Sequence, residues 1–336
     1  MLGRAKTVLL LALALVVLAA CGAPAPAKQA GGGPDLSGVT ITAGQSNKLS
    51  NRTLLQAAGL DDTPYKINWV DFNATPDMLQ AISAGAVDVG GNGGTTGAIQ
   101  AHYAGVNVKV AATAAGTGAG GQSSAIVVPK DSPAHSVADL RGKKIALTFG
   151  AGVQYYTVLA LKQFGLTTSD VQLVNLTTNA ALAAFQSGQI DAWAIWDPVL
   201  ATAQTQFGAR SILDAGQITD LGAQYTFQFT SPAALADQGK RAAIADFLHR
   251  VAQAQDWVNV HPDAWAKAGK SVSGLPDAAA NLAAQRQTKK YVPIGPDVIA
   301  ALQKEADEWV ALGTYKEKTD VSTVFTTELN NQVVTS

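Results

Sequence analysis

The chain has 336 residues and a formal net charge of −1, with 47% hydrophobic and 15% charged residues. This balance supplies apolar side chains for a sizeable core and does not suggest the clustered basic face of a nucleic-acid-binding protein. Cys21 is the single cysteine, so we expect neither an internal disulfide nor a thiolate metal site.

Residues 1–21 have the pattern of a bacterial lipoprotein signal peptide. Arg4 and Lys6 give a positive start, residues 8–20 form an apolar run, and small residues stand directly before Cys21. The run is shorter than the ~20 apolar residues of a membrane-spanning helix. We therefore predict cleavage before Cys21 and lipid attachment to it, which would hold the mature protein at the outer face of the cytoplasmic membrane or in the periplasm.

A flexible tether is predicted over residues 22–35, because this segment is rich in alanine, glycine and proline and has no large apolar residue. The folded part then begins near Leu36. About 300 residues remain, more than the ~100–200 of a typical domain, so the length favours two lobes.

Strands and helices alternate at the start of the folded part. Strands are predicted over 39–44 and 65–70, and a helix begins at Thr75, where a proline and an aspartate follow in the first turn. Gly85 is expected to end this helix, and residues 86–89 to form a short buried strand. Such alternation is typical of an α/β fold with mostly parallel sheets.

The helix, glycine stop, strand and acid of this unit recur 103 positions later in the chain. The corresponding residues are Leu79 and Leu182, Ile82 and Phe185, Gly85 and Gly188, Val87 and Ile190, and Asp88 and Asp191. This repeat supports two lobes of similar construction, each a mostly parallel sheet flanked by helices.

The chain is expected to pass between the lobes twice. Apolar strands over 123–129 and 225–230 are the candidates for these crossings. Helical spacing after residue 244 and after Pro296 then indicates a return to the first lobe. The predicted boundaries assign residues 36–124 and 229–336 to lobe one and residues 125–228 to lobe two.

Three glycine-containing loops precede helices and are candidate anion sites. They span residues 44–47, 90–96 and 150–155. Helix N-termini expose unpaired N–H groups and a positive dipole end, and glycine lets a ligand approach the main chain closely. The predicted binding residues in these loops are Gln45, Asn92, Gly93, Thr95, Gly152 and Gln154.

Residues near the crossings complete the predicted site. Trp193 and Trp196 would wall it against an apolar ligand tail, but residues three apart on a strand face opposite sides, so one of them is expected in the core. Asp197 is either a binding residue or the cap of a helix that begins with a proline. Ser123 and Phe229 are the remaining predicted binding residues.

Several segments together resemble one family of transport proteins. These segments are 66–72, 125–133 and 191–198, followed by 137–144 and 291–294. They are similar to the substrate-binding proteins of ABC importers for aliphatic sulfonates, within the wider nitrate, taurine and sulfonate group. The resemblance covers nearly the whole mature chain. It implies a two-lobed periplasmic-binding-protein type II fold, which closes over a small molecule and presents it to an ABC permease in the membrane. We further expect that the ligand is anionic and that the protein is a monomer.

The identity of the ligand stays open at this point. The family usually carries hydroxyl residues and often a histidine in its third loop, where this chain has Ala-Gly-Val-Gln at 151–154. Nitrate, taurine or a neutral pyrimidine precursor are therefore alternatives to an aliphatic sulfonate.

An extracytoplasmic enzyme is the main alternative class. Residues 116–121 satisfy the dinucleotide-binding pattern G-x-G-x-x-G, but that pattern requires a following helix, and a strand is predicted here instead. The four histidines show no metal-ligand spacing, and every glutamate lies at Glu305 or later. We therefore expect no catalytic residue, no metal and no cofactor.

Overall fold

A computed structural model describes residues 34–46, 49–72, 75–117 and 121–334. By its internal contacts the chain divides into two units, Met1–Asp35 and Leu36–Ser336, and every described helix and strand belongs to the second. The predicted signal peptide, Cys21 and nearly all of the tether lie outside the described residues. Within the described ranges, no helix combines the length and the apolar character needed to cross a membrane.

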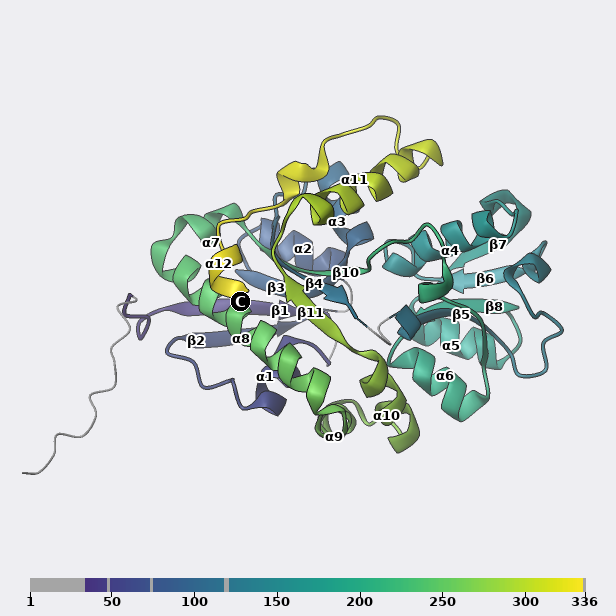
Figure 1. Cartoon of the computed structure of the whole chain (residues 1–336), viewed down its shortest axis with the longest axis horizontal. Coiled ribbons are helices and arrows are strands. Elements are labelled where there is room, and N and C mark those ends of the chain that lie inside the picture. The colour runs from purple at the N-terminus through teal and green to yellow at the C-terminus, as the bar shows by residue number, and fades with distance from the viewer. Residues whose placement is uncertain (1–33, 47–48, 73–74, 118–120, 335–336) are drawn as a thin grey trace, which may run out of the picture. The chain divides into compact units, whose positions relative to one another are not determined.

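Six strands form the first sheet, here named sheet A, in the order β11-β4-β10-β3-β1-β2 (Figure 1). Strand β1 pairs parallel with β2 and β3, whereas β10 pairs antiparallel with β3 and β4, and β11 antiparallel with β4. The bounds are β1 Thr40–Gln45, β2 Lys66–Asp71, β3 Val89–Gly94, β4 Lys109–Gly116, β10 Tyr225–Thr230 and β11 Lys289–Val292.

Five strands form the second sheet, sheet B, in the order β7-β6-β8-β5-β9. Their bounds are β5 Ser124–Val128, β6 Lys144–Leu147, β7 Gln172–Asn175, β8 Ala192–Trp196 and β9 Arg210–Asp214. Strand β6 pairs parallel with β7 and β8, and β5 pairs antiparallel with β8 and β9. The predicted α/β class is confirmed, but both sheets are mixed rather than mostly parallel. The reason is that the chain enters each sheet from the other one, through β5 or β10, at the edge where the parallel strands end. These two strands are therefore antiparallel to both of their neighbours.

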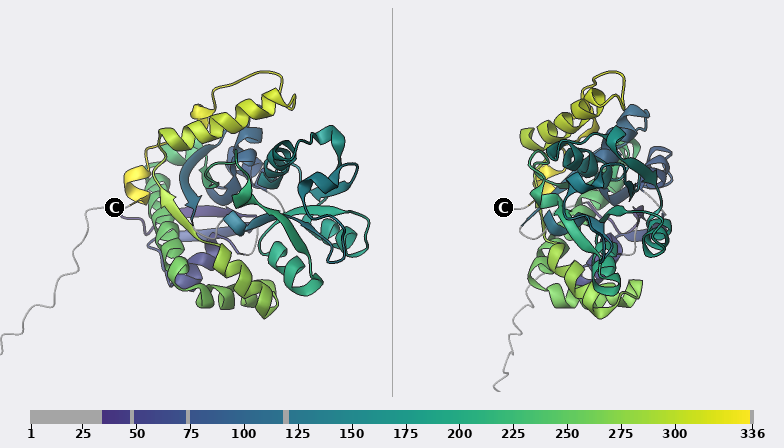
Figure 2. Two further views of the ribbon diagram at one scale, coloured as in Figure 1. Left: turned by 45° about the vertical axis from the view of Figure 1, so that its right-hand side comes forward. Right: turned by 90° about the vertical axis from the view of Figure 1, so that its right-hand side faces the viewer.

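Helices pack on both faces of each sheet (Figures 1 and 2). Their bounds are α1 Asn51–Ala58, α2 Thr75–Ser83, α3 Thr95–Tyr103, α4 Gly152–Gln163, α5 Thr178–Gln186, α6 Val199–Phe207, α7 Pro232–Ala236, α8 Gln238–Val260, α9 Pro262–Ser273, α10 Asp277–Arg286, α11 Pro296–Ala311 and α12 Asn330–Val333. Helices α1, α8 and α9 share one buried apolar cluster with sheet A. A second cluster joins α2, α3 and α11 to α4 and sheet B, so the two sheets are connected by packing.

Helix α2 confirms the predicted helix that begins at Thr75, and Gly85 follows its end with a left-handed φ of 75°. The strand expected over 86–89 is displaced, because β3 runs over the glycine-rich segment itself. These glycines are required by close packing. A Cβ atom on Gly90 would lie 2.7 Å from Met78 Sδ, and one on Gly93 would lie 2.5 Å from Phe229 Cε2. Four of the six residues of β3 are glycines, so the strand shows no alternation of apolar and polar side chains from which it could be predicted.

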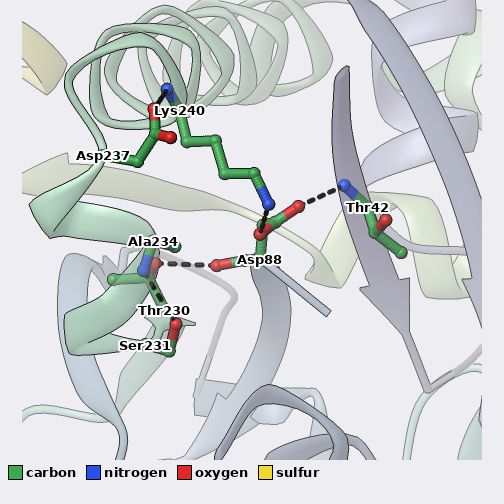
Figure 3. A network of polar contacts seen from close by, with 7 residues as sticks. All are labelled: Thr42, Asp88, Thr230, Ser231, Ala234, Asp237 and Lys240. Carbon is green, nitrogen blue, oxygen red and sulfur yellow. Dashed lines mark hydrogen bonds and ion pairs between the residues drawn. The ribbon is translucent and has the colours of Figure 1, made fainter. Parts of the chain in front are cut away.

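The two acids of the sequence repeat make the same contacts in the two sheets. Asp88 Oδ2 accepts a hydrogen bond from the Thr42 N–H at 2.8 Å, and Asp191 Oδ2 accepts one from the Lys144 N–H at 2.8 Å. Each aspartate also donates its own N–H to the carbonyl of the same partner residue. Asp88 additionally pairs with Lys240 Nζ at 2.7 Å (Figure 3). The 103-residue spacing therefore marks two acids that each hold a neighbouring parallel strand.

Two linkers connect the sheets. The first lies between β4 and β5, and its described residues are 117 and 121–123; the second comprises residues 215–224 before β10. The strands that we expected to cross each belong to a single sheet, and the crossings fall in the linkers. The linkers touch through their main chains, since a Cβ atom on Gly121 would lie 3.0 Å from the Cα of Gly216. Glycine at both positions allows this approach.

We expect Gly93→Ala to destabilise the protein by about 1–3 kcal/mol, because the added methyl group overlaps the fully buried Phe229 ring. Urea unfolding followed by circular dichroism measures this change.

Gly97→Ala in α3 is the matched control, since its nearest neighbour would be Thr75 Cγ2 at an ordinary 3.7 Å. Alanine favours a helix over glycine, so this variant is expected to be up to about 1 kcal/mol more stable. Equal stability of both variants would contradict the packing explanation of β3.

Candidate functional site

The ends of strands in both sheets meet the two linkers. In sheet A, Gly116 at the end of β4 pairs with Lys289 at the start of β11. In sheet B, Trp196 at the end of β8 pairs with Ser124 at the start of β5. Both linkers run between these two edges, which contain the carboxyl ends of the parallel strands, the usual ligand-binding position in open α/β sheets. We name them the linker edges of sheets A and B.

Side chains also join the helices next to the two linker edges. The Gln100 side chain of α3 lies against the loop before α4, because a Cβ atom on Gly150 would be 2.6 Å from Gln100 Oε1. From α4, Tyr156 Oη lies 3.4 Å from Oε1 of Gln224 in the second linker, and Tyr155 Oη donates a hydrogen bond to Glu308 of α11. The two edges are therefore in contact through polar side chains.

The three predicted glycine loops lead to the starts of α1, α3 and α4. In the described chain, their N-cap residues Ser50, Gly94 and Ala151 make no side-chain cap hydrogen bond to the first turn. Ser50 carries a hydroxyl group, but its Oγ donates to Gln45 Oε1 at 2.9 Å instead. N–H groups at helix N-termini favour negative charge, so these starts are chemically suited to an anion.

Gln45 is held inside the structure rather than presented to a ligand. Its side chain is buried, its Nε2 donates to Asp71 Oδ1 at 2.6 Å, and its Oε1 accepts from Ser50. We therefore correct its predicted role, because both amide groups are committed to fixing the end of β1 next to the start of α1.

Three further predicted binding residues lie in the core. Trp193 is 1% exposed and packs against Phe185 with ring centroids 5.8 Å apart. Phe229 is fully buried and lies against Gly93, which is itself buried. We correct the predicted ligand contacts of Trp193, Gly93 and Phe229, because strand alternation turns these positions toward packed helices.

Trp196 is the half-buried tryptophan of the pair, at the linker edge of sheet B. The next residue, Asp197, donates its N–H to the Ser123 carbonyl at 2.8 Å, which joins β8 to the first linker. Ser123 and Trp196 therefore stay in the candidate site. Gly152 stays as well, since it begins α4 beside the Tyr156 ring.

The side chain of Asp197 is buried near the start of α6, and the peptide bond from Asp197 to Pro198 is cis. Its Oδ1 accepts from the Ala201 N–H at 2.9 Å and lies 3.7 Å from Arg286 Nη1. Burial raises the pKa of Asp197 to about 6, although Arg286 and the Ala201 N–H act in the opposite direction. Among the described residues, Asp197 Oδ2 and Arg286 Nε have no hydrogen-bond partner. The capping alternative from the sequence therefore describes this residue better than a free ligand contact.

The loop residues Asn92, Thr95 and Gln154 have different surroundings. Asn92 is half-buried with a left-handed φ of 64°, a conformation that non-glycine residues adopt rarely. Thr95 is half-buried at the start of α3. Gln154 Oε1 accepts from the Gly150 N–H at 2.8 Å, so this amide fixes its own loop. Asn92 and Thr95 therefore remain candidates for direct contact.

Glu305 of α11 is a site residue that sequence reasoning missed. It is buried, and its Oε1 accepts from Thr96 Oγ1 at 2.6 Å and from Trp309 Nε1 at 3.3 Å. Burial raises the pKa of Glu305, while hydrogen bonds from Thr95, Thr96 and Trp309 lower it. The signal in the sequence was a glutamate on the apolar face of a helix, four residues before a tryptophan.

A cavity of about 290 Å³ is lined by side chains of α1, of β2 and of the segment between them, including Arg52 and Trp69. None of the predicted site residues lines this cavity. Over the described residues, no group of three histidine, cysteine, aspartate or glutamate side chains is arranged to hold a metal ion.

We expect Asp197→Asn to change the pH dependence of stability. The pKa of Asp197, about 6 in the folded protein, exceeds the ordinary value of about 3.9, so the folded state retains a proton that the unfolded state releases. The wild type should therefore gain about 1 kcal/mol over the variant when the pH falls from 7 to 5. Urea unfolding of both proteins at three pH values measures the difference, and parallel curves would contradict the assignment.

Comparison with known proteins places these features in a family. The family model described as NMT1/THI5 like matches residues 66–265. A putative aliphatic sulfonates-binding protein of Escherichia coli (strain K12) is 38% identical over 160 residues, which cover 48% of this chain and 49% of that relative. The match to this relative therefore spans about half of its length.

Longer matches support the same placement. A putative aliphatic sulfonates-binding protein of Bacillus subtilis (strain 168) is 27% identical over 95% of this chain and 94% of its own length. The solved structure of the alkanesulfonate-binding protein SsuA from Xanthomonas axonopodis pv. citri, bound to MOPS, is 27% identical with a TM-score of 0.73, over 85% of this chain and 98% of that one. On the matched family model, the chain belongs to the NMT1/THI5-like family.

Proposed function

We propose that this chain is the extracytoplasmic substrate-binding component of an ABC importer and that it captures a small organosulfur anion such as an aliphatic sulfonate. The observation that carries the proposal is the set of three helix N-termini, α1, α3 and α4, without side-chain caps in the described chain at the linker edges of two sheets. The relatives named as sulfonate-binding proteins support the same ligand class.

The ligand would present its charged head to helix N–H groups and its apolar tail to Trp196. Asn92 is a half-buried donor at the linker edge of sheet A, and the main-chain N–H of Thr95 lies at the start of α3. Both would contact polar groups of the ligand. Because the loop at 151–154 offers few hydroxyl donors, nitrate, taurine and a pyrimidine precursor are the alternative ligands to be tested beside sulfonates.

Capture would proceed by hinge closure. The two linkers are the natural hinge, and they would divide the folded part into lobes close to the predicted boundaries at 124–125 and 228–229. A ligand that contacts both linker edges binds the closed form better than the open form, and this difference in affinity supplies the free energy of closing. No chemistry on the ligand is required, so we propose a binding protein and not an enzyme.

Delivery requires a membrane partner. We propose that the closed monomer docks on an ABC permease, and that lipid on Cys21 with the tether over 22–35 holds it close to that permease.

Thermal-shift melting of the domain that starts at Leu36 tests the ligand class. The panel consists of alkanesulfonates, taurine, nitrate and pyrimidines. A ligand at 100 times its dissociation constant stabilises by about 2.7 kcal/mol, which is a melting shift of a few degrees for a domain of this size. We expect a shift with alkanesulfonates, and no shift with any compound would contradict the proposal.

Trp196→Ala should weaken the binding of an alkanesulfonate about tenfold, because it removes the aromatic wall for the apolar tail. Isothermal titration calorimetry measures the affinity, and circular dichroism checks folding. Phe207→Ala is the control, since Phe207 is an aromatic residue 40% exposed at the far end of α6. Equal affinities of both variants would remove Trp196 from the site.

Cys21→Ser should release the protein from membranes into the soluble fraction, because serine cannot receive the thioether-linked lipid. Cell fractionation followed by immunoblotting measures the distribution. Continued retention of the serine variant would contradict lipid anchoring.

A further inference from the structure

Lys289 lies at the linker edge of sheet A and has no counter-ion among the described residues. It begins β11 and pairs with Gly116, the last residue of β4. Asn259 binds both sides of its main chain, because Asn259 Oδ1 accepts from the Lys289 N–H at 3.3 Å and Asn259 Nδ2 donates to its carbonyl at 2.7 Å. The backbone is therefore fixed, whereas no ion pair or hydrogen bond of its Nζ occurs within the described residues.

The surroundings of Lys289 are unusual for a lysine. The residue is half-buried, and burial lowers the pKa of its ammonium group to about 8. Among the residues that the structure describes, no carboxylate offsets this lowering of the pKa. A cation removed from water without a partner is unfavourable in a folded protein, so such groups normally have an anion beside them. Arg286, the cation three residues earlier in the chain, already has an anionic partner, the Asp197 carboxyl group.

The strand register places Lys289 on the same face of sheet A as the start of α1. Lys289 and Tyr291 are two residues apart in β11 and so share a face. On that face, Gln228 Nε2 donates to Tyr291 Oη at 2.8 Å, and Asn51 Nδ2 donates to Gln228 Oε1 at 2.8 Å. Asn51 is the first residue of α1. Lys289 therefore lies two residue pairs nearer the linker edge than Tyr291, where a chain of polar contacts begins that ends at this helix N-terminus.

The α3 N-terminus differs, because the protein already supplies an acid there. Thr96 in its first turn donates to the buried Glu305 carboxyl group at 2.6 Å. An external anion would meet this carboxyl group at α3, whereas the first turn of α1 contains no acid and Lys289 lies on the same face of sheet A.

We propose that Lys289 is a ligand-binding residue whose ammonium group pairs with the anionic head of the captured molecule, together with the N–H groups at the start of α1. This assignment rests on the proposed function and extends it, since it requires a ligand with a negative charge, such as a sulfonate or another oxyanion, and excludes a neutral pyrimidine.

Calorimetric titration with ethanesulfonate tests the assignment. It compares the wild type with the variants Lys289→Gln, Lys289→Arg and Lys290→Gln. Lys290 is the matched control, since it is the next residue of β11, faces the opposite side and is exposed. We expect Lys289→Gln to weaken binding at least about tenfold, as the loss of a charge-assisted hydrogen bond does. Lys289→Arg should retain most of the affinity, and Lys290→Gln should bind as the wild type does.

Acylation of lysines, mapped by mass spectrometry on the wild type, gives a second measurement that needs no variant. Ethanesulfonate should protect Lys289 from the reagent and leave Lys290 unchanged. Wild-type affinity in Lys289→Gln, or labelling of Lys289 that ethanesulfonate does not alter, would overturn the assignment and leave the importer function standing. A wild type that binds no anion of the panel would overturn both.

Discussion

Strand β10 is the constraint on which the arrangement of the candidate site depends. It lies between β3 and β4 and pairs antiparallel with both, so its first residue and the last residue of β4 lie at the same edge of sheet A. The chain therefore leaves and re-enters sheet A at one edge. Because β5 enters sheet B in the same manner, both linkers run between the carboxyl ends of parallel strands, where helix N-termini also gather.

The glycines of β3 connect this pairing to the candidate site. Gly90 and Gly93 leave room for Met78 and Phe229, so α2 and β10 pack directly on the main chain of β3. Close packing of this kind fixes where β3 ends and where α3 begins, at Thr95. The position of the α3 N-terminus is thus a consequence of core packing, and residues such as Gly93 act on the site without touching a ligand.

The sequence predicted those parts of the fold that leave a local signal. The start of α2 at Thr75, the stop at Gly85 and the repeat of Asp88 and Asp191 follow from capping chemistry and periodicity, and the structure gives the two acids identical hydrogen bonds. The N-termini of the three helices that follow the glycine loops were also predicted, because these loops are visible in the sequence. Strand β3 was not predicted as such, because a run of glycines shows neither alternation nor apolar character.

The candidate site was harder to predict than the fold, because it depends on contacts between distant segments. Whether Gln45 faces a ligand depends on Asp71 and Ser50, which occupy its amide group. Strand alternation predicted that one of Trp193 and Trp196 lies in the core, but only the packing of Phe185 shows that it is Trp193. Tertiary neighbours decide such roles, and a single sequence does not contain them.

Charges of the protein itself distinguish the helix N-termini near the linker edges. The start of α3 lies next to the Glu305 carboxyl group. At the start of α6, Asp197 precedes the N-cap Pro198 and accepts a hydrogen bond from the Ala201 N–H, with Arg286 beside it. The start of α1 has no acid in its first turn, and its N-cap hydroxyl is turned to Gln45. An anion would therefore meet less competition from protein carboxylates at α1 than at α3 or α6, and α1 starts on the sheet face that also carries Lys289. A neutral ligand would leave that ammonium group without a partner after closure had removed more of its water, so the charge pattern favours an anionic cargo over a neutral one.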